Sequence, residues 1–355
     1  MASKVFTLLV GAYGSFIYSC RFDPSSKDIS LIGKSDSGPD PSWISTHPLN
    51  NSILLSTNEE NPIGGLSTFM ITDRTNGVVE RISNASSFGA DPAYIAALSS
   101  ARQVTVMNFS SGNGTFIPLG EDLLTPDEPH AQNITFDAPV SNPHQVVEIG
   151  DEILIPDLGA DKVWRLKQEP STGQDPVPNW KVRGFVQQPA GSGPRHIAVH
   201  EGILYTLHEK ASTLSSQTLP PLDSGVEPKT ISTFSVLPPG ANQSAFAAAE
   251  LVLDEKRKLL YASNRDLSPS PDPRGDAIAI FSFDCSGNLK PTSQVFTGLN
   301  RIRAMAHGGP DNVYIAAAGQ AGGGLAVFEK VNQTLVDRAR LSAGDIDEPA
   351  SFVWL

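Results

Sequence analysis

Short apolar runs separated by turn residues recur along the chain, and the clearest example lies between residues 142 and 166. Val146-Val147 and Ile153-Leu154-Ile155 are separated by a Gly-Asp pair, and a third run, Val163-Trp164-Arg165-Leu166, follows another turn that contains glycine. Runs of this length, rich in Val and Ile and bounded by Gly and Asp, are typical of β-strands joined by tight turns. Two polar residues of this unit, His144 and Asp157, are not explained by its apolar pattern.

The same unit returns at a regular spacing along the rest of the chain. Proline-led strand openings begin at residues 41, 92, 143 and 194, each 51 residues after the one before, and related openings follow near 248, 302 and 349. Each copy has room for about four short strands, and no long amphipathic helix is apparent. Seven copies with a period near 50 residues predict an all-β, seven-bladed β-propeller.

The two ends of the chain predict how the ring closes. The seventh copy stops after one strand, Pro349-Ala350-Ser351-Phe352, whereas residues 5–10 and 17–22 form a hairpin that lacks an opening strand. We therefore expect the last blade to be closed by the N-terminal strands, because this removes two exposed sheet edges. The predicted unit is a single propeller domain spanning residues 1–355.

A propeller brings distant residues together at one place. Its innermost strands line a central channel, and ligands bind at the channel mouth, where strand ends and loops of several blades converge. Side chains about 50 residues apart in the sequence can therefore meet there. His144 and Arg195 stand at equivalent points of two successive copies.

The net charge and hydropathy of the chain limit the classes of molecule that we expect the protein to bind. The 355 residues have a formal net charge of −12 and show no basic stripe with interleaved aromatic residues, which argues against nucleic acid. With this net charge, an anionic ligand needs local arginines. No run of 18 apolar residues occurs, so we expect no transmembrane helix and no membrane partner. The oligomeric state is left open.

The cysteines and the N-terminus bear on the compartment. Cys20 and Cys285 lie in no CxxC or zinc-ligand spacing, and the sequence does not say whether they pair. The N-terminal apolar run is short for a signal peptide and is better explained as the first strand, which favours the cytoplasm. Secretion is the alternative, if a native signal peptide is missing from this sequence. It is raised by glycosylation sequons that begin at Asn50, Asn84, Asn108, Asn113, Asn133, Asn242 and Asn332.

Six short motifs follow one another along the chain. They are Leu9-Val10-Gly11-Ala12-Tyr13, Asn142-Pro143-His144-Gln145-Val146, Pro156-Asp157-Leu158-Gly159-Ala160-Asp161, Gly193-Pro194-Arg195-His196, Leu204-Tyr205-Thr206-Leu207-His208-Glu209 and Tyr261-Ala262-Ser263-Asn264-Arg265. The Pro-Asp-Leu-Gly-x-Asp and Gly-Pro-Arg-His motifs are the more specific ones. Together these motifs resemble the lactonase family of seven-bladed propellers, whose members include bacterial 6-phosphogluconolactonase and fungal 3-carboxy-cis,cis-muconate lactonizing enzyme.

The resemblance implies an active site without metal or cofactor that acts on a small anionic organic substrate. In the muconate-cyclizing branch a histidine, a glutamate and two arginines face the channel, and by motif these are His144, Glu209, Arg195 and Arg265. Polar neighbours of these four are candidates for substrate binding. They are His196, His208, Asp157 and Asn264.

These residue types suit lactone chemistry in either direction. Two arginines can each hold a carboxylate through paired N–H···O bonds or stabilise a developing oxyanion. A histidine acts as general acid or base near neutral pH, and Glu209 would take a proton or orient the histidine. In hydrolysis, a His144–Glu209 pair would activate water. In cyclization, a substrate carboxylate would attack the substrate's own alkene or carbonyl.

Alternatives remain at the sequence level. The chain is also compatible with a cyclase or isomerase recruited to a specialised metabolite, or with a non-catalytic propeller used as a binding platform. Single residues have structural explanations too: His144 can bond a loop, Arg195 can cap carbonyl groups, and Asp157 can stabilise a tight turn.

Overall fold

The computed structural model describes residues 4–169 and 178–355, and this part of the chain is almost entirely β-strand. The strands are β1 (Phe6–Ala12), β2 (Phe16–Asp23), β3 (Asp28–Asp36), β4 (Ile44–His47), β5 (Asn50–Asn58), β6 (Gly65–Asp73), β7 (Val78–Ser86), β8 (Pro92–Ala97), β9 (Gln103–Asn108), β10 (Asn113–Pro118), β11 (Gln132–Thr135), β12 (Val147–Ile149), β13 (Glu152–Asp157), β14 (Lys162–Gln168), β15 (Trp180–Gln187), β16 (Pro194–His200), β17 (Ile203–His208), β18 (Thr213–Thr218), β19 (Thr230–Ser235), β20 (Phe246–Asp254), β21 (Leu259–Asp266), β22 (Ala277–Phe283), β23 (Leu289–Phe296), β24 (Asn300–Gly308), β25 (Tyr314–Gly322), β26 (Leu325–Val331), β27 (Thr334–Leu341) and β28 (Pro349–Trp354). Short 3₁₀ turns occur at Glu128–His130, Leu222–Ser224, Gln243–Ala245 and Pro310–Asn312.

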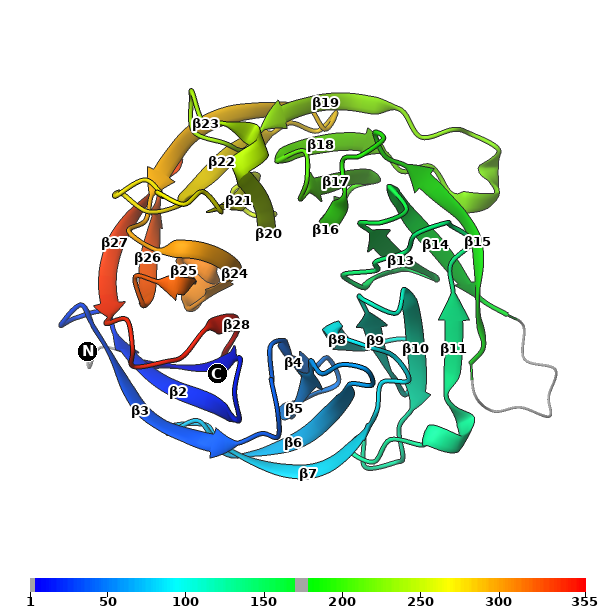
Figure 1. The fold of residues 1–355 in the computed structure, drawn as a ribbon, viewed down its shortest axis with the longest axis horizontal. Helices are drawn as coiled ribbons and strands as arrows, with labels where there is room; N and C mark the ends of the chain where they lie inside the picture. The colour runs from blue at the N-terminus through cyan, green and yellow to red at the C-terminus, as the bar shows by residue number, and fades with distance from the viewer. Residues whose placement is uncertain (1–3, 170–177) are drawn as a thin grey trace.

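The strands form a ring of blades around a common axis (Figure 1). We call the region enclosed by the inner strands the channel, although buried side chains such as Arg195 and His196 fill part of it. Within the described residues there are seven four-stranded antiparallel sheets, and six of them consist of consecutive strands, from β4–β7 to β24–β27. The innermost strands are β4, β8, β16, β20, β24 and β28 (Figure 1), and β12 takes the equivalent end position in its sheet. The prediction of an all-β, seven-bladed β-propeller is confirmed.

The seventh blade closes the ring as predicted. Its strand order is β28-β1-β2-β3, so the last strand of the chain lies innermost, beside the first. The pairing is antiparallel and places Leu9 opposite Val353. Because β28 and β1 pair with each other, neither strand has an unpaired edge where the two ends of the chain meet.

The hydrophobic core lies between neighbouring blades. All residues of β9, β10 and β13 are buried, because both faces of these middle strands are covered by the adjacent sheets. The outermost strand β3 is mostly exposed, and its outer edge is paired with no other described strand. This burial pattern explains why the middle strands are the most continuously apolar runs of the sequence.

Three further observations bear on the sequence-based expectations. Cys20 is buried, Cys285 is exposed, and both thiols are free. The sequon residues Asn108 and Asn113 are buried, so these two sites are closed to glycosylation in the folded chain. In the part of the chain that the structure describes, no helix is long and apolar enough to cross a membrane.

Candidate active site

One mouth of the channel is built from the first residues of inner strands and the last residues of the strands beside them. These two positions are adjacent because the strands are antiparallel: Pro194 pairs with His208, and Ala247 pairs with Arg265. Arg195 is the second residue of β16, and Glu209 directly follows β17.

Glu209 joins two arginines from different blades. Its Oε2 lies 2.8 Å from Nε of Arg195 and 3.0 Å from Nη2 of Arg265. Burial alone raises the pKa of Glu209, but the nearby arginines outweigh burial and hold the pKa below its ordinary value. The carboxylate is therefore a counter-charge for the arginines and a poor base.

The expected pair between His144 and Glu209 is not formed. No hydrogen bond links these two side chains in the described part of the chain, and Oε2 of Glu209 contacts Arg195 and Arg265 instead. The structure thus corrects the expectation that Glu209 orients the histidine.

Arg195 is almost completely enclosed. Its Nη1 donates to the carbonyl oxygen of Ala249 at 2.6 Å and lies 3.3 Å from Nε2 of His196. Burial lowers the pKa of Arg195 to about 9, and the positive charge of Arg265 adds to this while Glu209 opposes it. The guanidinium is still charged at neutral pH.

A third arginine completes the cluster, and our sequence reasoning did not find it. Nη2 of Arg303 lies 3.4 Å from both carboxylate oxygens of Glu59, and the Tyr13 hydroxyl donates to Oε2 of Glu59 at 2.9 Å. The positive charge of Arg303 contributes to the lowered pKa of Glu209, so the two ion pairs influence each other electrostatically.

The repeat contained a signal for these missed residues. Glu59 directly follows β5, as Glu209 directly follows β17, so the two glutamates occupy equivalent positions in their blades. Arg303 lies near the start of inner strand β24, as Arg195 does in β16. Aligning charged residues across the copies would have found both.

His144 lies in the extended segment before β12, where its backbone N–H donates to the Pro156 carbonyl oxygen at 3.0 Å. Its side chain is 4% exposed, and Nδ1 is buried without a hydrogen-bond partner in the described residues. The ring centroid is 5.1 Å from that of His196. Burial, followed by the positive charge of Arg195, holds the pKa of His144 well below its usual range. The imidazole is therefore neutral at pH 7 and able to accept a proton.

His196 lies behind Arg195 and next to His144. Its Nδ1 is 2.6 Å from Oε1 of Glu250, and its ring meets the rings of Trp43 and Tyr94 edge-on, at centroid distances of 5.5 and 6.1 Å. The side chain is fully buried. His196 therefore contacts the cluster through Arg195 and His144, which keeps it a candidate for the site.

The structure does not bring Asp157 into this cluster. Its Oδ1 accepts hydrogen bonds from the backbone N–H groups of Asn142, Gly159 and Ala160, and its Oδ2 accepts from the Ser141 hydroxyl and from Nε1 of Trp164. Both oxygens are thus used to hold the turn after β13. The role of Asp157 is structural, which corrects its assignment to substrate binding.

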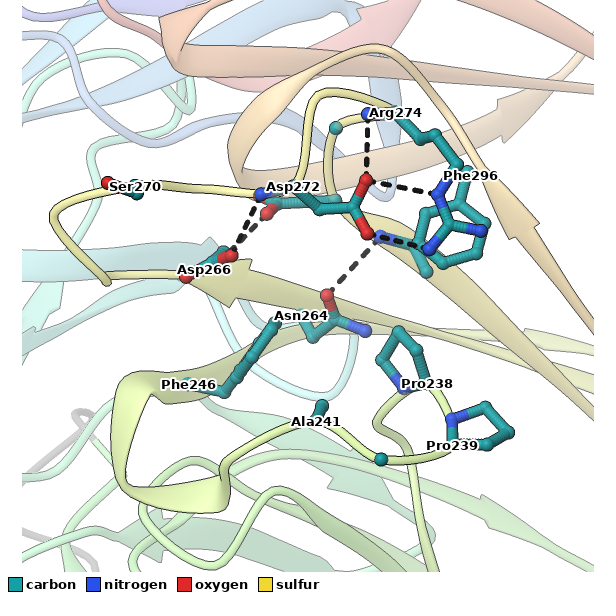
Figure 2. A pocket seen from close by; sticks show the side chains of 14 residues that line it. Pro238, Pro239, Ala241, Phe246, Asn264, Asp266, Ser270, Asp272, Arg274 and Phe296 are labelled. Atoms are coloured by element: carbon teal, nitrogen blue, oxygen red, sulfur yellow. Dashed lines mark hydrogen bonds and ion pairs between the residues drawn. The ribbon is translucent and has the colours of Figure 1, made fainter.

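Asn264 also faces away from the arginines. It lines a separate cavity of about 310 Å³, with its amide turned toward the loop that carries Asp272 and Arg274 (Figure 2). Its Nδ2 donates to the Val236 carbonyl oxygen, and its Oδ1 accepts from the backbone N–H of Ala277. Neighbours along a strand point to opposite faces, so Arg265 reaches the channel and Asn264 does not.

His208 is the third candidate outside the cluster, for the same reason. It is fully buried, with Nε2 2.9 Å from Oε1 of Gln188 and Nδ1 3.0 Å from the Thr213 hydroxyl oxygen. Burial lowers the pKa of His208 to about 4. Its role is to fill the blade in the neutral form.

This burial predicts a pH effect on stability. Between pH 6.5 and 4 the unfolded chain binds a proton at His208 that the folded chain does not, so stability falls as the pH falls through this window. Once His208 is protonated in both states, the free energy of unfolding has fallen by about 3 kcal/mol. Urea unfolding should show that the free energy of unfolding decreases less from pH 7 to pH 4.5 in His208→Gln than in the wild type. His200→Gln, which changes a less buried histidine of β16, should keep the wild-type loss. An equal loss in all three proteins would contradict the assignment.

No group of three or more His, Cys, Asp or Glu side chains that could hold a metal ion occurs in the described residues. The cluster is instead three arginines, two glutamates, Tyr13 and the His144–His196 pair. Such a set can bind an anion, stabilise an oxyanion and accept a proton.

Comparison with known proteins agrees with this architecture. A protein of Arthroderma benhamiae named "Probable 6-phosphogluconolactonase" is 24% identical over 364 residues, which cover 97% of this chain and 88% of that protein. The solved structure of the periplasmic gluconolactonase of Pseudomonas aeruginosa superposes with a TM-score of 0.82 at 22% identity, over 99% of both chains. A protein from Lactobacillus plantarum also gives a TM-score of 0.82, at 18% identity, over 99% of this chain and 100% of that one.

The family comparison covers nearly the whole chain. The model of the family described as "Lactonase, 7-bladed beta-propeller" matches residues 7–349. This match confirms the resemblance seen in the sequence motifs and supports the expectation of a lactone-hydrolysing enzyme. The chain belongs to the lactonase family of seven-bladed β-propellers.

Proposed function

We propose that this protein hydrolyses a small lactone that carries an anionic group. The observation that supports this most strongly is the charge of the cluster. Three arginines form ion pairs with only two glutamates, Glu209 and Glu59, so these five side chains sum to +1 in a chain whose net charge is −12, and the further buried carboxylate of Glu250 is bonded to His196 instead. A buried positive site in an acidic protein favours a negatively charged ligand.

The arginines keep donors available for such a ligand. In the described part of the chain, Nε of Arg195 contacts Glu209 and its Nη1 donates to the carbonyl oxygen of Ala249. Nε of Arg265 donates to the carbonyl oxygen of Ala247, and its Nη2 contacts Glu209. Nη2 of Arg195 and Nη1 of Arg265 are left for the substrate. Guanidinium N–H groups held in place before the reaction stabilise a developing oxyanion without a cost of reorientation.

His144 is the proposed general base. Its neutral imidazole takes a proton from the water that attacks the lactone carbonyl, while an arginine stabilises the tetrahedral oxyanion. As the ring C–O bond breaks, the imidazolium returns that proton to the leaving oxygen. The product is a hydroxy acid, and Glu209 keeps Arg195 and Arg265 in place throughout.

The names of the relatives supply a pair of substrates for the test. One is called a 6-phosphogluconolactonase and another a gluconolactonase, and their two lactones differ by a phosphate. We expect kcat/KM for the phosphorylated lactone to exceed that for the neutral lactone by about 100-fold, because charge-assisted hydrogen bonds each contribute about 1.5–3 kcal/mol. Equal values for the two lactones would contradict an anion-binding role for the cluster.

The lactonizing direction is a second candidate, favoured by the number of arginines. Three guanidinium groups also suit a substrate with two or three carboxylates, one of which would attack intramolecularly. Incubation with carboxylated unsaturated diacids, followed by detection of the lactone product, separates this activity from hydrolysis.

A further inference from the structure

Behind the arginine cluster, three buried side chains form a continuous line away from the site. Nη1 of Arg195 lies 3.3 Å from Nε2 of His196, and Nδ1 of His196 lies 2.6 Å from Oε1 of Glu250. Arg195 is 1% exposed, His196 0% and Glu250 5%. None of the roles proposed above for hydrolysis uses Glu250.

The hydrogen bonds of this line fix the tautomer of His196. An ionised Glu250 can only accept, so Nδ1 of His196 carries the hydrogen and Nε2 is left as an acceptor. Nε2 then accepts from Nη1 of Arg195, which also donates to the carbonyl oxygen of Ala249. With Nε of Arg195 on Glu209, the remaining Nη2 is directed to the substrate.

Glu250 also borders a cavity on the other side of His196. This cavity, of about 270 Å³, is lined in part by residues farther along β20 and β24, among them Leu253, Met305 and His307. A second cavity, of about 460 Å³, shares Leu253 and His307 with it and reaches the exposed residues Glu255 and Lys256. Glu250 thus lies between Arg195 at the catalytic mouth and cavities that are lined by residues toward the other ends of β20 and β24.

We propose that Glu250 and His196 are positioning residues that hold Arg195 in its catalytic orientation, and that small solutes reach Glu250 through the opposite mouth of the channel. The proposal rests on the proposed lactone hydrolysis. Its physical basis is donor–acceptor matching: a hydrogen on Nε2 of His196 would oppose the N–H of Arg195, and the guanidinium would lose its orientation. Misplacement of a catalytic group by about 1 Å can cost about 100-fold in rate.

The test uses the cavity. Glu250→Ala removes the carboxylate next to a cavity that is large enough for a small carboxylic acid. We expect kcat/KM to fall about 100-fold in this variant. Added formate should raise kcat/KM again by at least about 10-fold, and this recovery should saturate with formate concentration. Rates are divided by the wild-type rate at the same formate concentration, because formate also competes for the arginines. Glu255→Ala, which changes an exposed carboxylate at the second cavity, is the matched control and should show neither loss nor recovery.

A second variant covers the case in which Glu250→Ala does not fold. Glu250→Gln keeps the shape but offers an amide N–H to Nδ1, which allows the wrong tautomer. We expect it to unfold at the wild-type urea concentration and to lose about 10-fold or more in kcat/KM without recovery by formate.

The possible outcomes are distinguishable. Full activity of Glu250→Ala or Glu250→Gln overturns the positioning role while leaving the proposed hydrolysis intact. Loss of activity in folded Glu250→Ala that formate does not restore overturns access through the opposite mouth, because no carboxylate then replaces the missing one. A wild-type protein that hydrolyses no lactone overturns the proposed function and this inference together.

Discussion

Replacement of His144 by alanine should lower kcat for lactone hydrolysis by about 10²–10⁴-fold, which is the range typical of a lost general base. KM should change little, because the arginines that bind the anion lie on other strands. The side chain is nearly buried, its Nδ1 has no partner in the described residues, and its pKa is held low by burial and by Arg195. These properties keep a neutral acceptor in place at pH 7.

The pH profile gives the same prediction a second readout. Because the pKa of His144 lies well below its usual range, kcat/KM should stay constant from pH 7 to well below pH 6.5 and fall only at more acidic pH. His200→Ala is the matched control: His200 lies at the far end of β16, with its ring 5.5 Å from that of Phe283. Wild-type kcat in His144→Ala would show that His144 is not the base.

Replacement of Glu209 by glutamine should be the most destabilising change at the site. Glutamine keeps the shape but leaves Arg195 and Arg265 without their shared counter-charge, and removing one partner of a buried ion pair costs about 3–5 kcal/mol. We place the expected loss at the lower end, about 3 kcal/mol, because the Glu209 side chain is 23% exposed.

Urea unfolding measures this loss as a lower midpoint at an unchanged m-value. Glu329→Gln breaks the more exposed ion pair with Arg338 and should cost less than about 1 kcal/mol. Adding Arg265→Met to Glu209→Gln should recover part of the stability, since one unpaired charge is then gone. A midpoint of Glu209→Gln equal to that of Glu329→Gln would show that Glu209 does not stabilise the arginines.

The fold could be predicted from the sequence because one signal is repeated seven times. Apolar runs with a period near 50 residues indicate the blades, and the incomplete seventh copy indicates the join between β28 and β1. The antiparallel pairing of each inner strand with its neighbour then explains why Arg195, Glu209 and Arg265 meet.

The direction of single side chains could not be predicted, because it depends on local irregularities of the strands. Strict alternation would send Arg195 and His196 to opposite faces, but the register of β16 shifts between Pro194 and His196, and both side chains belong to the cluster. The register of β24 shifts in the same way between Ile302 and Met305, around Arg303. Bulges of this kind re-aim side chains next to functional sites and leave no clear mark in the sequence.

Alternation does hold where the strands are regular, and there it explains the candidates that do not reach the site. Asn264 and His208 precede Arg265 and Glu209 by one residue and therefore point away from the channel. Asp157 was selected for its motif, but its five hydrogen bonds hold a turn.

The most direct test of the proposed function is the proton release that accompanies hydrolysis of 6-phosphogluconolactone, recorded with a metal chelator present, for the wild type and for His144→Ala. We expect wild-type turnover far above the spontaneous rate, unaffected by the chelator, and a rate close to spontaneous hydrolysis for the variant. Wild-type turnover that the chelator abolishes, or equal rates for the two proteins, would contradict a hydrolytic site made of His144 and the three arginines.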